Sequence, residues 1–193
     1  MSGPETELGE KIQATKHRLP NETFLGMATR VVHALNDSPE HREELQPIVV
    51  TQRFMFAGRI PAGVGTDKHV TPFNCYASAK LEDSFVEGKD SIMGVATQGA
   101  ATMRMGGGIG FDFSPLRPRN ALIKKLGSKS SGPVSFMHIY DAVCGATSSA
   151  GERRGAMMGV MRIDHPTIEE FIHAKRNDDA LTGFNVSTGV TDL

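Results

Sequence analysis

The 193-residue chain has only two cysteines, no long apolar run and a formal net charge of only −1, and each of these features argues against a class of protein. Because acidic and basic residues balance, there is no broad basic field for nucleic acid. Cys75 and Cys144 form no CxxC pair, which argues against a disulfide framework or a structural zinc site and favours a reducing, cytosolic setting. No apolar run approaches the roughly 18 residues of a membrane span, and the polar start MSGPETELGEK lacks the apolar region of a signal peptide.

The first part of the chain, residues 1–50, has the pattern of a helical region. Residues 1–20 are charged, and we expect them to be loosely ordered. Asn21 is the expected N-cap of the next helix. The apolar residues that follow it at helical spacing are Phe24, Met27, Val31 and Leu35. The sequence NDSP at 36–39 should end this helix, and a short charged helix is expected over 39–47.

The remainder, residues 51–193, has the pattern of an α/β domain. The stretch VVTQRFMF at its start fits strand or helix, and the Gly- and Pro-rich segment after it predicts a long loop. From residue 90 predicted helices and strands alternate, in the order DSIMGVATQGAATMRM, GGGIGFDF, SGPVSFMHIYDAVCGAT, GAMMGVMRI, DHPTIEEFIHAKRN and FNVSTGV. Asp90 or Ser91 should cap the first of these helices and Asp164 the last, and GAMMGVMRI should be a strand buried on both faces. This order predicts a parallel sheet with right-handed crossovers.

The glycine run MRMGGGIGFDF, residues 103–113, poses the main question of the sequence. It does not match G-x-G-x-x-G, because residue 111 is phenylalanine, and it follows a helix where a Rossmann or P-loop cradle follows a strand. A helix stop and a tight turn need only one or two glycines. Four glycines favour close approach of the backbone by a ligand or another chain. The pattern alone leaves both interpretations open.

The cysteines and two basic loops also carry two interpretations each. Cys75 is either a small buried hydrophobe or a thiol in a Gly- and Pro-rich site, whereas Cys144 lies on the apolar face of a predicted helix and is expected in the core. The loops at 116–132 and 148–159 either are solvated or bind a small anionic ligand through their arginines. The remaining titratable candidates, His69, His138, His165 and His173, lack metal-ligand spacing, so no metal site is expected.

Six segments, in order over residues 15–193, together resemble the large catalytic chain of ribonucleotide reductase, most closely the adenosylcobalamin-dependent (class II) enzymes. They are QRFMFAGRIPAGVGT, VTPFNCYAS, TMRMGGGIGFDFSPLRPR, SSGPVSFMHIYDAVC, SSAGERRGAMMGVMRIDHPTIEEFIHAKRN and LTGFNVSTGVTD. The resemblance implies an N-terminal helical segment followed by the first half of a ten-stranded α/β barrel, incomplete in this chain. It also implies thiyl-radical chemistry, in which a cysteine pair supplies the electrons that replace the 2′-hydroxyl of a ribonucleotide with hydrogen.

The resemblance assigns roles to particular residues. Cys75 is similar to the N-terminal member of the redox cysteine pair. The residues that correspond to the substrate site are Thr71, Asn74, Gly107, Gly108 and Arg154. Those that correspond to the effector site and its relay loop are Asp83, Ser84, Asp90, Ser91, Arg117, Arg119, Arg153, Gly155 and Ala156. The two Asp-Ser pairs are alternatives for one role, because FVEGK looks like a local insertion between them.

The resemblance further implies cofactors and partners. It implies adenosylcobalamin, bound mostly by segments beyond this chain, or a radical from a metal-containing small subunit. Its other ligands and partners would be a ribonucleotide substrate, dNTP or ATP effectors, a C-terminal half carrying the N-x-C-x-E finger loop, a thioredoxin-type reductant and a second copy bound through the effector-site helices. We therefore expect a fragment or split subunit of a ribonucleoside-diphosphate reductase. The alternatives are a non-catalytic nucleotide-binding module and an inactive truncated product.

Overall fold

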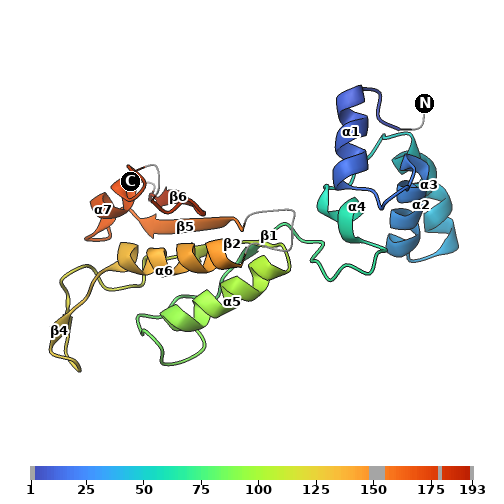
Figure 1. The fold of residues 1–193 in the computed structure, drawn as a ribbon. Helices are drawn as coiled ribbons and strands as arrows, with labels where there is room; N and C mark the ends of the chain where they lie inside the picture. Colours follow the sequence, from blue (N-terminus) through green and yellow to red (C-terminus); the bar gives the residue numbers. More distant parts are fainter. Residues whose placement is uncertain (1–2, 148–154, 178–179, 192–193) are drawn as a thin grey trace. The chain divides into compact units, whose positions relative to one another are not determined.

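The computed structural model describes residues 3–147, 155–177 and 180–191, and its contacts divide the chain into two compact units, Met1–Phe73 and Asn74–Leu193 (Figure 1). The sequence placed the domain boundary after residue 50, whereas residues 51–73 group here with the N-terminal helices. The reason is apolar packing, because Phe56 and Ile60 lie against the buried face of the second helix. Among the described residues, no helix is both long and apolar enough to cross a membrane.

The N-terminal unit consists of helices α1 (Glu7–Lys16), α2 (Phe24–Leu35), α3 (Pro39–Val50) and α4 (Arg59–Gly63). The expectation that residues 1–20 are loosely ordered is wrong, because α1 forms there. The Thr6 hydroxyl oxygen accepts a hydrogen bond from the Gly9 N–H at 3.0 Å and caps the helix. Acidic residues in the first turn and a lysine in the last also suit the helix dipole.

Helix α2 carries the predicted apolar face but begins at a different cap. Phe24, Met27 and Val31 are buried, as expected. Thr23 is the N-cap, since its hydroxyl accepts from the Gly26 N–H, and Asn21 instead lies in the left-handed region at φ 63°. The helix ends at the predicted NDSP turn. Helix α3 then runs three residues past its expected end at position 47, to Val50.

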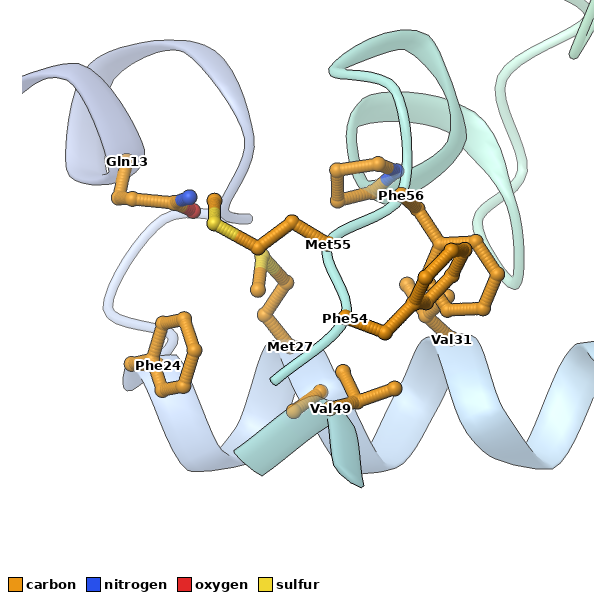
Figure 2. Close-up of a pocket in the computed structure, with 10 residues that line it drawn as sticks. Gln13, Phe24, Met27, Val31, Val49, Phe54, Met55 and Phe56 are labelled. Carbon is orange, nitrogen blue, oxygen red and sulfur yellow. The ribbon is translucent and has the colours of Figure 1, made fainter. Parts of the chain in front are cut away.

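Two polar side chains inside this unit differ in their hydrogen bonding. Arg30 donates to both carboxylate oxygens of Glu22, at 2.8 and 2.9 Å, and to the carbonyls of Pro61 and Val64, which ties α2 to the segment around α4. Gln13 is buried, and its carboxamide oxygen has no hydrogen-bond partner within the described residues. Figure 2 shows this carboxamide directed toward Met55 in a small, mainly apolar cavity of about 20 Å³.

The C-terminal unit is built on four parallel strands in chain order, β1 (Cys75–Ala77), β2 (Gly108–Asp112), β5 (Met157–Arg162) and β6 (Phe184–Gly189). Helices α5 (Ile92–Arg104), α6 (Pro133–Ala146) and α7 (Ile168–His173) connect them. The predicted alternation of helices and parallel strands is therefore confirmed. The sequence did not predict the antiparallel hairpin formed by β3 (Leu122–Ile123) and β4 (Ser128–Lys129), which lies between β2 and α6.

The two faces of this sheet differ in what covers them. One face packs on the three helices, in a core that includes Ile109, Phe111, Met157, Phe184 and Tyr140. The expectation that β5 is buried on both faces is wrong, because its side chains alternate between buried and accessible. A sheet whose strands follow chain order receives every right-handed crossover on the same side, so the described helices cover one face only. We call the other one the open face.

The caps of the connecting helices differ partly from expectation. Ser91 caps α5, since its hydroxyl accepts from the Gly94 N–H at 3.2 Å. Asp164 does not cap α7 and instead pairs with the Arg162 guanidinium, with Nε–Oδ1 at 3.0 Å. Thr167 occupies the N-cap position of α7 without a side-chain cap hydrogen bond, and the Nδ1 of the buried His165 accepts from the Thr167 N–H at 3.2 Å. The His165 Nε2 reaches the Leu116 carbonyl oxygen at 2.8 Å, so both ring nitrogens have structural partners.

Candidate functional site

The glycine run serves two structural purposes before any ligand is considered. Gly106 has φ 85° and ends α5, which requires the conformational freedom of glycine. A Cβ on Gly107 would lie 2.8 Å from Tyr76 Cε2 and 2.9 Å from Thr102 Cγ2. These neighbours, on β1 and α5, leave no room for a side chain at this position. Gly107 is buried, so packing alone explains its missing side chain, and its contact with a nucleotide stays a prediction.

Gly108 and Cys75 form the centre of the candidate site on the open face. They are register partners at the starts of β2 and β1, and Cys75 is exposed. The Gly108 N–H donates to the Asn74 carbonyl at 2.8 Å, and a Cβ on Gly108 would lie 3.3 Å from the Ala156 carbonyl oxygen. Gly110 follows on the same face. An accessible thiol beside two glycines can be reached by a ligand that lies flat against the strands.

The other cysteine is unsuited to chemistry. Cys144 is buried on α6, as the sequence predicted. Burial raises the pKa of its thiol, and the nearby Asp141 carboxylate raises that pKa further. A Cβ on Gly155 would lie 2.7 Å from the Cys144 sulfur, so backbone closes over this thiol. Since the thiolate is the reactive form, Cys144 is an inert core residue.

The remaining substrate-site candidates lie partly in the N-terminal unit and partly outside the described residues. Thr71 belongs to the N-terminal unit, where its hydroxyl accepts from the Phe73 N–H at 3.1 Å. Arg153 and Arg154 lie outside the described residues. Ala156 is exposed, and its carbonyl accepts from the Ile109 N–H at 3.1 Å, at the start of β5. The start of β5 therefore lies beside the start of β2, and the sheet itself positions Ala156, whose place in a relay loop stays a prediction.

A second site lies at a hollow of about 710 Å³ between the loop before α5, the β3–β4 hairpin and α6. Asp83, Ser84 and Arg117 line it, so the first Asp-Ser pair and one predicted arginine meet there. The Asp83 carboxylate accepts from Arg117 Nε at 2.6 Å. Lys124 and Lys125 add positive charge from the hairpin turn.

The sequence did not identify the apolar part of this hollow. Phe85 and Phe136 line it with their ring centroids 6.1 Å apart, and Leu122 and Leu126 contribute from the hairpin. All but Phe136 are exposed, Leu126 by 74%. The signal available in the sequence was the pattern LIKKLGSK, in which apolar and basic residues surround a glycine turn. Aromatic rings beside cationic side chains suit an anion that carries a flat organic group.

The other effector candidates have structural roles. The second Asp-Ser pair lies at the start of α5, where Ser91 is buried as the N-cap and the Asp90 carbonyl accepts from the Glu82 N–H. Arg119 forms an ion pair with Glu170 on α7 and donates to the Ser135 hydroxyl at 3.3 Å. It is not among the residues that line the hollow. The local geometry therefore favours the first Asp-Ser pair and Arg117.

A metal or cofactor site would need clustered ligand side chains or a large hollow among the described residues. No group of three or more histidine, cysteine or acidic residues in the described ranges could hold a metal ion. Two open hollows of the C-terminal unit measure about 710 and 450 Å³. Pockets for drug-sized ligands span roughly 300–1,000 Å³, and a cobalamin, with its corrin ring and nucleotide arm, is far larger. Neither of these two hollows is large enough to enclose adenosylcobalamin.

Comparisons with known proteins agree with this architecture. Residues 74–193 match the family model described as ribonucleotide reductase, barrel domain. The vitamin B12-dependent ribonucleoside-diphosphate reductase of Mycobacterium tuberculosis (strain CDC 1551 / Oshkosh) is 43% identical over 113 residues, which cover 58% of this chain and 16% of that protein. The enzyme of the same name from Thermoplasma acidophilum is 46% identical over 90 residues, covering 46% of this chain and 12% of that protein.

A solved structure shows the same fold. The Actinobacillus ureae class Id ribonucleotide reductase alpha subunit superposes with a TM-score of 0.78 at 20% identity, over 98% of this chain and 34% of that chain. The predicted fold, helices followed by an incomplete α/β barrel, is confirmed. The chain spans about a sixth or less of the length of these two curated relatives. It belongs to the ribonucleotide reductase family, and its residues 74–193 are part of the barrel domain.

Proposed function

We propose that this chain is the N-terminal part of a ribonucleoside-diphosphate reductase, active only together with the remainder of the barrel. The observation that carries the proposal is the exposed Cys75 thiol at the start of β1, beside Gly108 on the open face of the sheet. The family match and the names of the curated relatives support the reaction class. The product would be a deoxyribonucleotide for DNA synthesis.

In this proposal Cys75 is one of two thiols that reduce the ribose. The C2′–O bond breaks and the oxygen leaves as water, while a hydrogen takes its place on carbon. The two thiols become a disulfide, so the two electrons lost by sulfur equal the two gained by the sugar. A thiyl radical on the finger loop would abstract the 3′ hydrogen and return it afterwards. That cysteine, the second redox cysteine and the thioredoxin-type reductant would come from outside this chain.

The radical source would also lie outside this chain. The curated relatives are named vitamin B12-dependent, which supports adenosylcobalamin, whose bound form supplies the initiating radical. Because neither hollow described above can enclose that cofactor, we assign it no contact here. Cobalamin dependence of the reconstituted enzyme tests this assignment, and activity that instead requires a metal-containing small subunit would contradict it.

We further propose that the hollow beside α5 binds an effector nucleotide. Arg117, Lys124 and Lys125 supply the positive charge that phosphates need, and Phe85 and Phe136 supply apolar surface for a base. The hollow lies next to α5 and α6, the helices through which a second copy would bind in a homodimer. Effector identity would reach the substrate through the loop that ends at Ala156.

The test is reconstitution with a chain that supplies the rest of a reductase barrel, including its finger loop. We expect no turnover from the 193-residue chain alone and turnover from the combined chains. Cys75→Ser should abolish reduction, whereas Cys144→Ala, the matched control, should retain it. Full activity of Cys75→Ser, or sustained activity of the chain alone, would contradict the proposal.

The hollow itself favours a second candidate, a nucleotide-binding module without chemistry. It predicts that dNTP binding persists while no complementary chain restores reduction. Reconstituted activity that depends on Cys75 would exclude it.

A further inference from the structure

We propose that residues 82–90, which we call the closing loop, regulate the hollow by placing Asp83 on Arg117 in competition with an incoming anion. The proposal rests on the proposed effector function of the hollow and concerns how that site opens. It gives Asp83, which the resemblance assigns to the effector site, the role of pairing with Arg117 while the hollow is empty. Asp83 would act as a built-in competitor, and a polyphosphate would have to displace it to reach Arg117.

The closing loop is a compact element with joined ends. The Glu82 N–H donates to the Asp90 carbonyl at 2.8 Å, which closes the loop at its base. Inside it, the Glu87 N–H donates to the Ser84 hydroxyl at 3.1 Å, and Gly88 has φ 90°. A short surface loop with adjacent ends and internal hydrogen bonds is a compact element of the Ω-loop kind.

The loop also occupies the N-terminus of α5, where an anion would otherwise bind. The Ile92 and Met93 N–H groups donate to the carbonyls of Ser84 and Phe85, at 2.8 and 3.0 Å. The Gly94 N–H donates to the Ser91 hydroxyl. Free N–H groups at a helix N-terminus attract phosphate, and these three are already satisfied. The closed structure therefore offers no helix-end site.

The closing loop packs tightly against α5 at Gly94. A Cβ at this position would lie 2.3 Å from the Lys89 carbonyl oxygen and 2.8 Å from the Lys89 carbonyl carbon. Both atoms are backbone, so the loop would have to move to admit a methyl group. Alanine favours a helix over glycine, so Gly94→Ala should open the loop and leave α5 intact.

The ion pair between Asp83 and Arg117 is exposed enough for another anion to replace the Asp83 carboxylate on Arg117. Their side chains are 30% and 34% exposed, and pairs with this much solvent access are weak. Around them, Lys125 is 3.9 Å from Glu87 with both side chains largely exposed, and Lys124 makes no ion pair within the described ranges. A polyphosphate would meet these lysines first and gain Arg117 only by releasing Asp83.

The experiment measures binding of tripolyphosphate and of dTTP to the 193-residue chain by isothermal titration calorimetry. Tripolyphosphate has no sugar or base, so it reports on the cations alone. Asp83→Asn should tighten tripolyphosphate binding about twofold to fivefold, the range expected from losing an exposed competing ion pair. Gly94→Ala should tighten it too, and the double variant should gain less than the product of the two factors, because both act through one opening.

The charge-matched control is Glu82→Gln, which removes one negative charge from the same loop without touching Arg117. It should leave the affinity nearly unchanged, and circular dichroism should show that all variants remain folded. Adding Arg117→Gln to Asp83→Asn should cancel the gain. If wild type binds dTTP while Asp83→Asn fails to tighten tripolyphosphate binding, the competition is refuted and the effector site stands. If no variant binds either probe, both the effector site and its regulation fail.

Discussion

Substituting Gly107 by alanine tests whether this position is a glycine because neighbouring side chains pack against it. The added methyl would lie 2.8 Å from Tyr76 Cε2 and 2.9 Å from Thr102 Cγ2, whereas comfortable carbon contacts are about 3.5–4.0 Å. These atoms belong to β1 and α5, so movement away from one does not relieve the other. Overpacking of this kind costs roughly 1–3 kcal/mol, and we expect about 2 kcal/mol of the free energy of unfolding to be lost.

Gly110→Ala is the matched control, because Gly110 lies on the open face two residues after Gly108. Its methyl would have Met158 Cβ as its nearest neighbour, at 3.7 Å, which is an ordinary contact. We expect its stability to stay within about 0.5 kcal/mol of wild type. The comparison separates a glycine required by packing from one that a ligand could require.

Tyrosine fluorescence during urea unfolding measures both variants. The chain has two tyrosines and no tryptophan, and Tyr76 and Tyr140 both lie in the C-terminal unit, so the signal reports that unit alone. With an m-value of about 2 kcal/mol/M, Gly107→Ala should lower the urea midpoint by roughly 1 M. A wild-type midpoint for Gly107→Ala, or a larger loss for Gly110→Ala, would refute the packing argument.

Three further predictions concern the N-terminal unit and the thiols. Because the Arg30 hydrogen bonds hold the pKa of Glu22 below its ordinary value of 4.5, their stabilisation should be complete above pH 4.5 and disappear as pH falls through the lowered pKa. Glu22→Gln should therefore lower the free energy of unfolding by about 1–3 kcal/mol at neutral pH, seen by circular dichroism as a lower melting temperature, and make no difference in acid. Gln13→Met should raise that melting temperature by removing an unpaired buried oxygen, worth about 1 kcal/mol, and a lower value would contradict the cavity's apolar character. A disulfide reagent should modify Cys75 at once and Cys144 only after urea unfolding; prompt labelling of both would contradict the burial of Cys144.

Where hydrophobic periodicity was strong, the sequence predicted the fold well. The alternating helices and strands after residue 90 were identified because each buries a regular apolar face. The position of Cys144 in the core followed from the same periodicity. Helix α1 was missed because its stability comes from Thr6 and the terminal charges, while its apolar residues are few. Periodicity cannot detect a helix held mainly by its ends.

Burial of β5 and the choice of effector residues depended on three-dimensional information. Both faces of GAMMGVMRI are apolar, so its sequence could not show that the described helices cover only one of them. The two Asp-Ser pairs differ little in composition, and only the geometry shows Ser91 buried as a cap and Asp83 beside Arg117. The resemblance to a family identified the region of the effector site, while the apolar half of the hollow depended on the unpredicted β3–β4 hairpin.

The division of the sheet into a helix-covered face and an open face separates two kinds of mutation. Side chains of one strand alternate between the faces, so Met157 contributes to stability while its neighbour Met158 can change with little effect on folding. Substitutions on the open face can therefore accumulate every second residue and alter what the sheet binds. A saturation mutagenesis scan of β2 and β5 that selects for folding alone should show tolerance with a period of two.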